Sequence, residues 1–309
     1  MPFDTELFLA GPLREPKQML ATQEYGGHLS IHDDETAAKL GFAAGPIEGP
    51  THFSQFVPLL VDVWGTDFLE RGCLSAHYQN VCTEGDRVRA FVARPLSDGD
   101  RCVRIWAEKA DGKPVLTGTA TIGPDHEASE LDGRMARLRP TERLLILEHL
   151  RVGMKGAGVE RVAMDFDQNM GALYPFSLEQ KLAVITEPSP WYTREHGAES
   201  PWGRAIIPWE MVSVLAEHSS TQAQFPVKGP AVGLFADQEI KMIKGPLFVG
   251  HPYALEREVV ALSESRRTES YWVRTRILDG ETNDLVAEML LNHATLKESY
   301  AGYRDRGQM

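Results

Sequence analysis

The chain of 309 residues is 42% hydrophobic and 25% charged, which is typical of a folded globular protein with one large domain or two smaller ones. Its 32 Lys and Arg residues against 44 Asp and Glu residues give a net charge of −12, which argues against binding nucleic acid through surface charge. It has no apolar run of the ~20 residues that a membrane helix needs, no signal-peptide pattern, and three cysteines (Cys73, Cys82 and Cys102) in no metal-binding spacing. We therefore expect a cytoplasmic protein that has no metal or other cofactor and contacts neither nucleic acid nor membrane.

The chain contains an internal repeat. Residues 31–65 and 191–219 each run from a polar or aromatic loop through a glycine to a proline five residues later, and then into an apolar segment. The pairs are Gly45 with Pro50 and Gly203 with Pro208. Apolar residues at helical spacing follow both prolines, namely Phe53, Phe56, Leu59, Leu60 and Val63 in the first copy and Met211, Val214 and Leu215 in the second. Because proline lacks an N–H that would be unpaired at a helix start, each proline predicts where a buried helix begins.

Strand-like segments follow each predicted helix. They span 74–81, 86–96, 101–110 and 113–122 after the first helix, and 232–243, 253–262, 270–278 and 284–296 after the second. Their β-branched content and local alternation are typical of antiparallel strands with one buried face. Asp111-Gly112 and Asp279-Gly280, each ahead of the last segment of its set, are typical of hairpin turns. The sequence therefore predicts an α+β architecture in two similar halves.

The domain organisation follows from this repeat. We place an N-terminal repeat at 1–122 and a C-terminal repeat at 173–300. The polar, charged stretch at 123–172 predicts an external connector with a short helix at 141–153. Residues 301–309 are expected to form a frayed tail.

The residues ahead of the first predicted helix resemble the MaoC-like (R)-specific enoyl-CoA hydratase family. Members of that family carry an Asp, then x-Asn-Pro-x-His, x-Asp, an Ala four residues on, and a Gly-rich bend before the hot dog helix. The positions that follow this pattern are His32, Asp34, Ala38, Gly41, Phe42, Gly45, Pro46 and Ile47. Residues 187–192 of the second half fit the same frame with replacements. The resemblance covers most of both halves and implies a double hot dog fold, with a curved antiparallel sheet wrapped around a central helix in each repeat.

The resemblance also implies a chemistry. In this family a carboxylate and an imidazole share the proton transfers as water adds to the double bond beside a thioester carbonyl, and an N–H at the helix start stabilises the enolate oxygen. Here Gly27 stands at the position of the family's Asp, and Tyr192 replaces the His of the second half. Pro50 and Pro208 stand at the oxyanion-hole glycine, so the amide of Thr51 or Trp209 would have to replace the missing donor.

We expect a modified catalytic set in which His32 and Glu187 transfer protons and Tyr192 holds the substrate carbonyl. Whether they share one pocket or belong to two equivalent ones stays open; in the second case His52 or Glu210, each two residues after a helix proline, completes a site. Each of these has a structural alternative. His32 could be an ordinary loop histidine and Glu187 a solvated turn carboxylate. His52 could be a packed imidazole and Glu210 a carboxylate that complements the helix dipole. The candidates for substrate contact are Asp34, Gly49, Thr51, Trp191, Trp202 and Trp209, with a helix N-cap as the alternative for Asp34 and core packing for the tryptophans.

The leading functional hypothesis is a lyase of the hydratase/dehydratase type that acts on an acyl thioester of CoA or of an acyl carrier. A thioesterase, or another lyase or isomerase that uses Glu210, is the runner-up, and a non-catalytic acyl-binding protein is the third hypothesis. Because one chain supplies both halves, we expect a monomer or a homodimer. His28 and His32, four residues apart, would form a metal pair only on a helix, which the neighbouring glycines and Ile31 disfavour.

Overall fold

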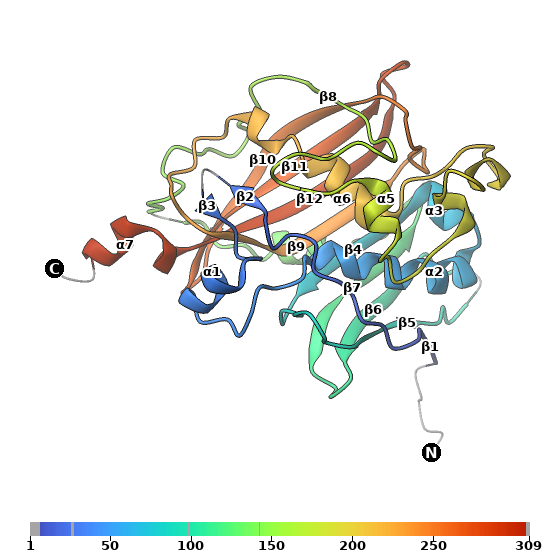
Figure 1. Ribbon diagram of the computed structural model, residues 1–309, viewed down its shortest axis with the longest axis horizontal. Coiled ribbons are helices and arrows are strands. Elements are labelled where there is room, and N and C mark those ends of the chain that lie inside the picture. The colour runs from blue at the N-terminus through green and yellow to red at the C-terminus, as the bar shows by residue number, and fades with distance from the viewer. Residues whose placement is uncertain (1–6, 26–27, 98, 142, 307–309) are drawn as a thin grey trace.

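The computed structural model describes residues 7–25, 28–97, 99–141 and 143–306, and within these ranges it forms one ten-stranded antiparallel sheet and a small hairpin (Figure 1). The large sheet runs, from edge to edge, β1 (Phe8–Ala10), β5 (Val88–Ala93), β6 (Cys102–Lys109), β7 (Pro114–Ile122), β4 (Gly72–Tyr78), β9 (Gly233–Met242), β12 (Leu285–Leu296), β11 (Thr268–Asp279), β10 (Tyr253–Glu264) and β8 (Glu160–Val162). The hairpin pairs β2 (Glu24–Tyr25) with β3 (His28–Leu29). The predicted strand segments are confirmed.

The two halves of the large sheet repeat one strand order. Outward from the centre, β4, β7, β6, β5 and β1 correspond to β9, β12, β11, β10 and β8. The halves join where β4 pairs with β9, from Cys73 opposite Lys241 to His77 opposite Asp237. The Asp-Gly turns also lie where they were predicted, between β6 and β7 and between β11 and β12, and Gly112 has the left-handed φ of +83° that such a turn requires.

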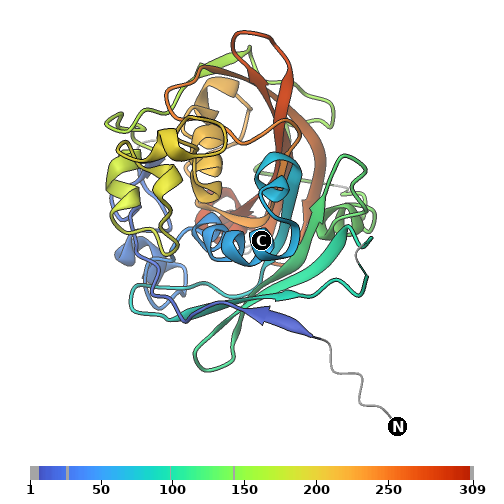
Figure 2. The ribbon, with the colours of Figure 1, turned by 90° about the vertical axis from the view of Figure 1, so that its right-hand side faces the viewer.

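Helices of both halves lie on the concave side of the sheet, which curves around them (Figure 2). The first half contributes η1 (Gly49–Phe56), α2 (Val57–Trp64) and α3 (Asp67–Arg71), and the second contributes α6 (Trp209–Glu217) and η4 (Ser220–Ala223). Both predicted helices begin beside their prolines, Pro50 and Pro208. Every residue of α6 is buried, because this helix packs against the sheet on one side and against η1 on another.

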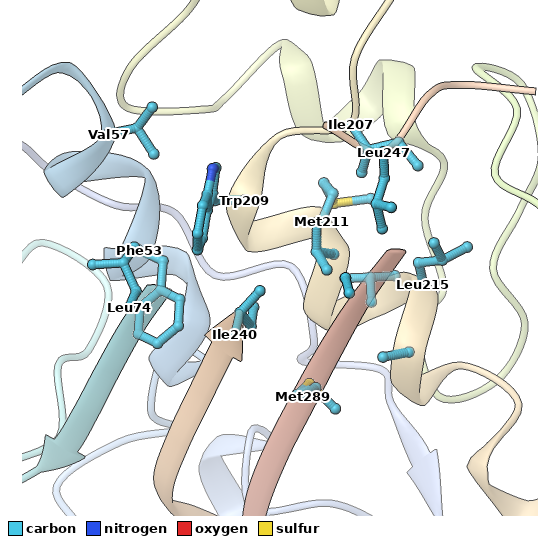
Figure 3. Packing of buried hydrophobic residues seen from close by; sticks show 14 of the residues in the cluster. Phe53, Val57, Leu74, Ile207, Trp209, Met211, Leu215, Ile240, Leu247 and Met289 are labelled. Carbon is cyan, nitrogen blue, oxygen red and sulfur yellow. The ribbon is translucent and has the colours of Figure 1, made fainter. Parts of the chain in front are cut away.

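One hydrophobic core spans the two halves. Figure 3 shows Phe53 and Leu74 of the first half facing Trp209, Ile240 and Met289 of the second. The indole of Trp209 stacks on the ring of Phe68 in α3, with 4.8 Å between the ring centroids and 11° between the planes. The halves therefore bury their apolar faces against each other across the seam of the sheet.

We expect Trp209→Ala to lower the free energy of unfolding by about 3–5 kcal/mol, because it empties the centre of this shared core. Guanidinium unfolding followed by circular dichroism measures the loss. Trp106→Ala is the control. Trp106 is half-buried on β6, so its replacement removes less apolar surface from the interior. Equal losses in the two variants would contradict the central position of Trp209.

The predicted connector is partly wrong. Residues 141–153 form no helix over the part that the structure describes, because the Glu269 carboxylate of β11 accepts the backbone N–H groups of Leu145, Ile146 and Leu147 at 2.7–2.9 Å and holds them in a loop. The helix of this segment is instead α4 (Glu130–Met135), which begins with a capping box at Ser129. The segment also supplies the edge strand β8.

The remaining elements are short. They are α1 (Asp34–Lys39), α5 (Leu178–Leu182), η2 (Pro190–Tyr192), η3 (Gly197–Glu199), η5 (Lys297–Ser299) and α7 (Ala301–Arg306). The expected frayed tail is therefore wrong for Ala301–Arg306, which is helical. None of the helices in the described ranges has the length and hydropathy to cross a membrane.

Candidate active site

A cavity of about 960 Å³ lies between the two halves. The first half lines it with the loop before α1, the start of η1 and the end of β4, and the second half lines it with the end of α6, with η4 and with strands β9 to β12. The volume falls within the range of pockets that enclose small organic ligands. The polar side chains on its wall that enter the arguments below are His32, Glu48, His52, Tyr174, Glu217, Arg257, Tyr271 and His293.

His32 reaches this cavity from the loop ahead of α1. Its Nδ1 lies 2.5 Å from the carbonyl oxygen of Pro46. Because a carbonyl only accepts hydrogen bonds, Nδ1 carries the proton and Nε2 keeps its lone pair. Burial lowers the pKa of His32 to about 4, against the weaker opposing effect of the Pro46 hydrogen bond, so the imidazole is neutral at physiological pH.

The bend at Gly45 holds this loop in place. A Cβ on Gly45 would lie 2.1 Å from the carbonyl oxygen of His32, so only glycine allows the two backbones to come so close. Asp34 accepts a hydrogen bond from the Gly45 N–H at 2.8 Å, and its side chain is exposed. The N-cap of α1 is Asp33, which accepts from Thr36 N at 2.8 Å, so the N-cap alternative for Asp34 is wrong by one residue.

Glu48, directly ahead of η1, was not among the sequence candidates. Its carboxylate is buried, lines the cavity and accepts a hydrogen bond from the Tyr174 hydroxyl at 2.8 Å. Burial raises the pKa of Glu48 to about 7, although the Tyr174 hydrogen bond and the charge of Lys181 act in the other direction. A carboxyl with such a pKa exchanges its proton near neutral pH, as a general acid or base must.

His52 lies within η1 and also lines the cavity. It is 2% exposed, and its Nδ1 has no hydrogen-bond partner within the described part of the chain. Burial, with a contribution from the charge of Lys181, lowers the pKa of His52 to about 4. A neutral imidazole in this position can donate one N–H to a bound ligand.

The start of η1 offers few backbone donors. Pro50 has no N–H, and the Thr51 N–H donates to the carbonyl oxygen of Glu48 at 3.2 Å, so the expected replacement donor at Thr51 is engaged within the helix. The Thr51 hydroxyl accepts from Lys181 Nζ at 3.4 Å. Gly49 does line the cavity, and a Cβ there would lie 2.4 Å from the Tyr78 ring.

The second-half candidates lie outside this cavity. Glu187 forms a two-pronged ion pair with Arg14, at 2.7 and 2.9 Å. Glu210 is buried between the helices, where it pairs with Lys181 at 2.8 Å and accepts from the Ser54 hydroxyl at 3.0 Å. Tyr192 is buried as well, and burial raises the pKa of its phenol well above the usual value. The lining of the cavity therefore brings His32 and His52 together but includes none of these three.

The three tryptophans pack rather than line the cavity. Trp209 lies in the shared core, and Trp191 and Trp202 meet edge to face with 5.9 Å between their ring centroids. Trp202 Nε1 also donates to Glu70 Oε1 at 2.9 Å. The three tryptophans therefore occupy packing positions, which was the alternative to their predicted role in substrate contact. Gly27, at the position of the family's Asp, lies outside the described residues.

The second half contributes a charged wall. Arg257 donates to Glu160 at 2.8 and 3.0 Å and to Glu217 at 2.8 Å, with all three side chains buried. His293 lies beside them, with its Nε2 3.8 Å from Glu217 Oε2. Sequence reasoning missed this wall, because these four residues come from four separate elements and no local motif links them.

One group of described residues could hold a metal ion. His251, Asp279 and Glu281 place their ligand atoms within 4.8 Å of one another at the turn between β11 and β12, outside the cavity lining. Asp279 already pairs with His251 at 2.7 Å and accepts the N–H groups of Glu281 and Thr282 at 2.9 Å. These contacts stabilise the turn.

No protein-family model and no curated protein matches the sequence. Solved structures match in fold over nearly the whole chain. A protein from Chloroflexus aurantiacus described as a MaoC domain protein dehydratase has a TM-score of 0.57 and 15% identity, and the match covers 95% of this chain and 96% of that one. RV0216 from Mycobacterium tuberculosis, described as having a double hotdog fold, has a TM-score of 0.59 and 12% identity over 95% and 97% of the two chains.

A MaoC-like dehydratase matches with a TM-score of 0.51 and 14% identity over 95% of this chain and 98% of its own. At such identities the similarity establishes the fold alone. The α+β class and the double hot dog fold predicted from the sequence are therefore confirmed, and the structural neighbours include the MaoC-like dehydratases that the sequence resembles.

Proposed function

We propose that this double hot dog protein is a hydratase/dehydratase that adds water to, or removes it from, the acyl group of a thioester. The observation that carries the proposal is that His32 and Glu48 of the first half both line the cavity. His32 has a free Nε2 and a pKa of about 4, and Glu48 has a pKa of about 7. A neutral base and a protonated acid then coexist between these values, as the addition of water requires.

In the hydration direction, His32 Nε2 takes a proton from water while the water oxygen bonds to Cβ of the enoyl group. The π electrons of the double bond move toward the thioester carbonyl, and the Glu48 carboxyl delivers its proton to Cα. His32 is then protonated and Glu48 ionised, and a proton passes from one to the other through solvent to restore both. The reverse sequence removes water from the 3-hydroxyacyl group.

Negative charge develops on the thioester oxygen during this step and needs a donor. Thr51 N–H is engaged with Glu48 and Pro50 has no N–H, so neither of these two residues supplies the donor. We assign this role to the neutral His52 ring, which lines the same cavity from η1. A neutral imidazole that acts as electrophile is an established solution to this problem.

Thioester hydrolysis is the second candidate, because a carboxylate beside the hot dog helix could activate water. Glu210, the carboxylate first considered for it, is paired with Lys181 and Ser54 outside the cavity, so Glu48 would have to activate the water.

The cavity draws residues from both halves of one chain, so we propose that a monomer already contains a complete site and that a homodimer is not required.

The deciding experiment offers the protein a trans-2-enoyl-CoA and follows two signals together. Hydration removes the absorbance of the conjugated enoyl thioester and releases no thiol, whereas hydrolysis releases free CoA. We expect loss of the enoyl absorbance with an intact thioester. Release of free CoA in an amount equal to the substrate consumed would show hydrolysis and contradict the proposal. Binding of a broad panel of acyl-CoA esters without either signal would contradict an enzymatic function.

A further inference from the structure

The charged wall of the cavity is acidic on balance. Arg257 is shared by two buried carboxylates, Glu160 and Glu217. Its N–H groups are all engaged, with Glu160, Glu217, Thr275 Oγ1 and the carbonyl oxygen of Ala216 as acceptors. The guanidinium therefore has no donor left for an anionic ligand, and one negative charge is left without a matching cation.

Glu217 is the carboxylate of this cluster that lines the cavity. Its carboxylate accepts hydrogen bonds from Arg257 and from the Ser220 hydroxyl, while its Oε2 lies 3.8 Å from His293 Nε2, beyond hydrogen-bond distance. Burial raises the pKa of Glu217 despite the charge of Arg257, and burial lowers the pKa of His293 to about 3, so the imidazole supplies no positive charge. A carboxylate can accept about four hydrogen bonds, so beyond Arg257 and Ser220 Glu217 keeps acceptor capacity toward the cavity.

A row of rings crosses the sheet beside Glu217. Phe235 on β9 pairs with His293 on β12, which in turn pairs with Tyr271 on β11, and all three line the cavity. The Tyr271 and His293 rings stack with 4.7 Å between centroids, and Phe235 meets His293 edge to face at 5.6 Å. This side of the cavity therefore combines flat aromatic rings with one acidic acceptor.

Resting on the proposed function, we propose that the substrate's acyl group carries a hydrogen-bond donor, a hydroxyl or an amine, that binds Glu217 Oε2 while its carbon chain lies along the Phe235–His293–Tyr271 row. His32, Glu48 and His52 of the first half hold the thioester end, and Glu217 lines the same cavity from α6 of the second half. A plain alkyl end would leave the remaining acceptor sites of this buried carboxylate unfilled, which is unfavourable. An acyl end that bears a carboxylate would meet uncompensated negative charge.

The test measures binding of saturated acyl-CoA esters, which need no turnover, by isothermal titration to the unaltered protein. Four ends are compared at each of several chain lengths: methyl, hydroxyl, ammonium and carboxylate. We expect the hydroxyl or ammonium ester of the best length to bind at least about tenfold more tightly than its methyl counterpart, and the carboxylate ester most weakly. An apolar tunnel would give the opposite order, because exchanging a methyl for a polar group forfeits hydrophobic burial.

Glu217→Gln keeps an acceptor for Arg257 but removes the charge, and we expect it to reduce the ammonium preference at least about tenfold. Glu179→Gln, an exposed carboxylate on α5, is the matched control and should change nothing. A methyl ester bound as tightly as the others by the unaltered protein would overturn the inference even if hydration proceeds. Donor preference without hydration would leave the inference standing and remove the proposed function, and no binding of any ester would overturn both.

Discussion

His32→Ala should lower the rate of enoyl-thioester hydration by about 10²–10⁴-fold, because it removes the base that deprotonates water in the proposed mechanism. It should leave the fold intact. His32 is a loop residue that is not part of the hydrophobic core, and its ring contributes one hydrogen bond, to Pro46. We expect kcat and kcat/KM to fall together, since the lost interaction belongs to the transition state. Steady-state kinetics on the variant, with circular dichroism for the fold, measure both.

Two further variants serve as controls for His32→Ala. His149→Ala removes an exposed histidine outside the cavity lining and should retain full activity. Glu187→Gln should also retain most activity, because Glu187 pairs with Arg14 away from the cavity. Full activity in His32→Ala would exclude His32 as the base, and a loss in Glu187→Gln as large as in His32→Ala would restore the pair first inferred from the sequence.

The fold was largely predictable from the sequence because its signals are local and occur twice. Helix-start prolines, Asp-Gly turns and runs of alternating residues each depend on a few neighbouring positions. The predicted helix at 141–153 failed for the opposite reason. Its backbone N–H groups bind Glu269, which is more than 100 residues away in the sequence, and this long-range contact outweighs the local helical preference.

The site was predicted less well, because it depends on which side chains meet. Of the candidates that line the cavity, His32 was named because the family pattern places an imidazole there, and His52 because it follows Pro50. Glu187 and Glu210 were named as catalytic candidates from their local sequence. That sequence does not show that Arg14 and Lys181, which lie in distant segments, form ion pairs with them. Glu48 gave no such signal, since nothing in its neighbours indicates that it is buried.

The two copies of the repeat differ in the residues that follow the helix proline. Thr51 and His52 follow Pro50 in the first half, whereas Trp209 and Glu210 follow Pro208 in the second. The Trp209 indole stacks on Phe68 and fills the space at the start of its helix, and Glu210 is held by Lys181. The cavity between the halves is composite: the first half lines it with His32, Glu48 and His52, and the second half with Tyr174 and Glu217 among others.

Glu48→Gln should also lower hydration by about 10²–10⁴-fold, and it should change the pH profile in a way that no merely structural role predicts. For the unaltered protein, log kcat/KM for hydration should form a bell. Activity falls below about pH 4, as His32 gains a proton and ceases to be a base, and falls above about pH 7, as Glu48 loses the proton that it must deliver. In Glu48→Gln the alkaline limb near pH 7 should disappear from the residual activity.

The stability of this variant separates chemistry from folding. The folded state raises the pKa of Glu48 from 4.5 to about 7, so burial favours the neutral carboxyl. Its contribution to stability is fully present below about pH 4.5 and is lost as the pH rises through 7. Glutamine resembles the neutral carboxyl and can still bond to the Tyr174 hydroxyl. We therefore expect Glu48→Gln to match the unaltered protein in urea unfolding at low pH and to exceed it above pH 7. A variant that is destabilised at every pH, or whose alkaline limb persists, would place the acid of the reaction on another residue.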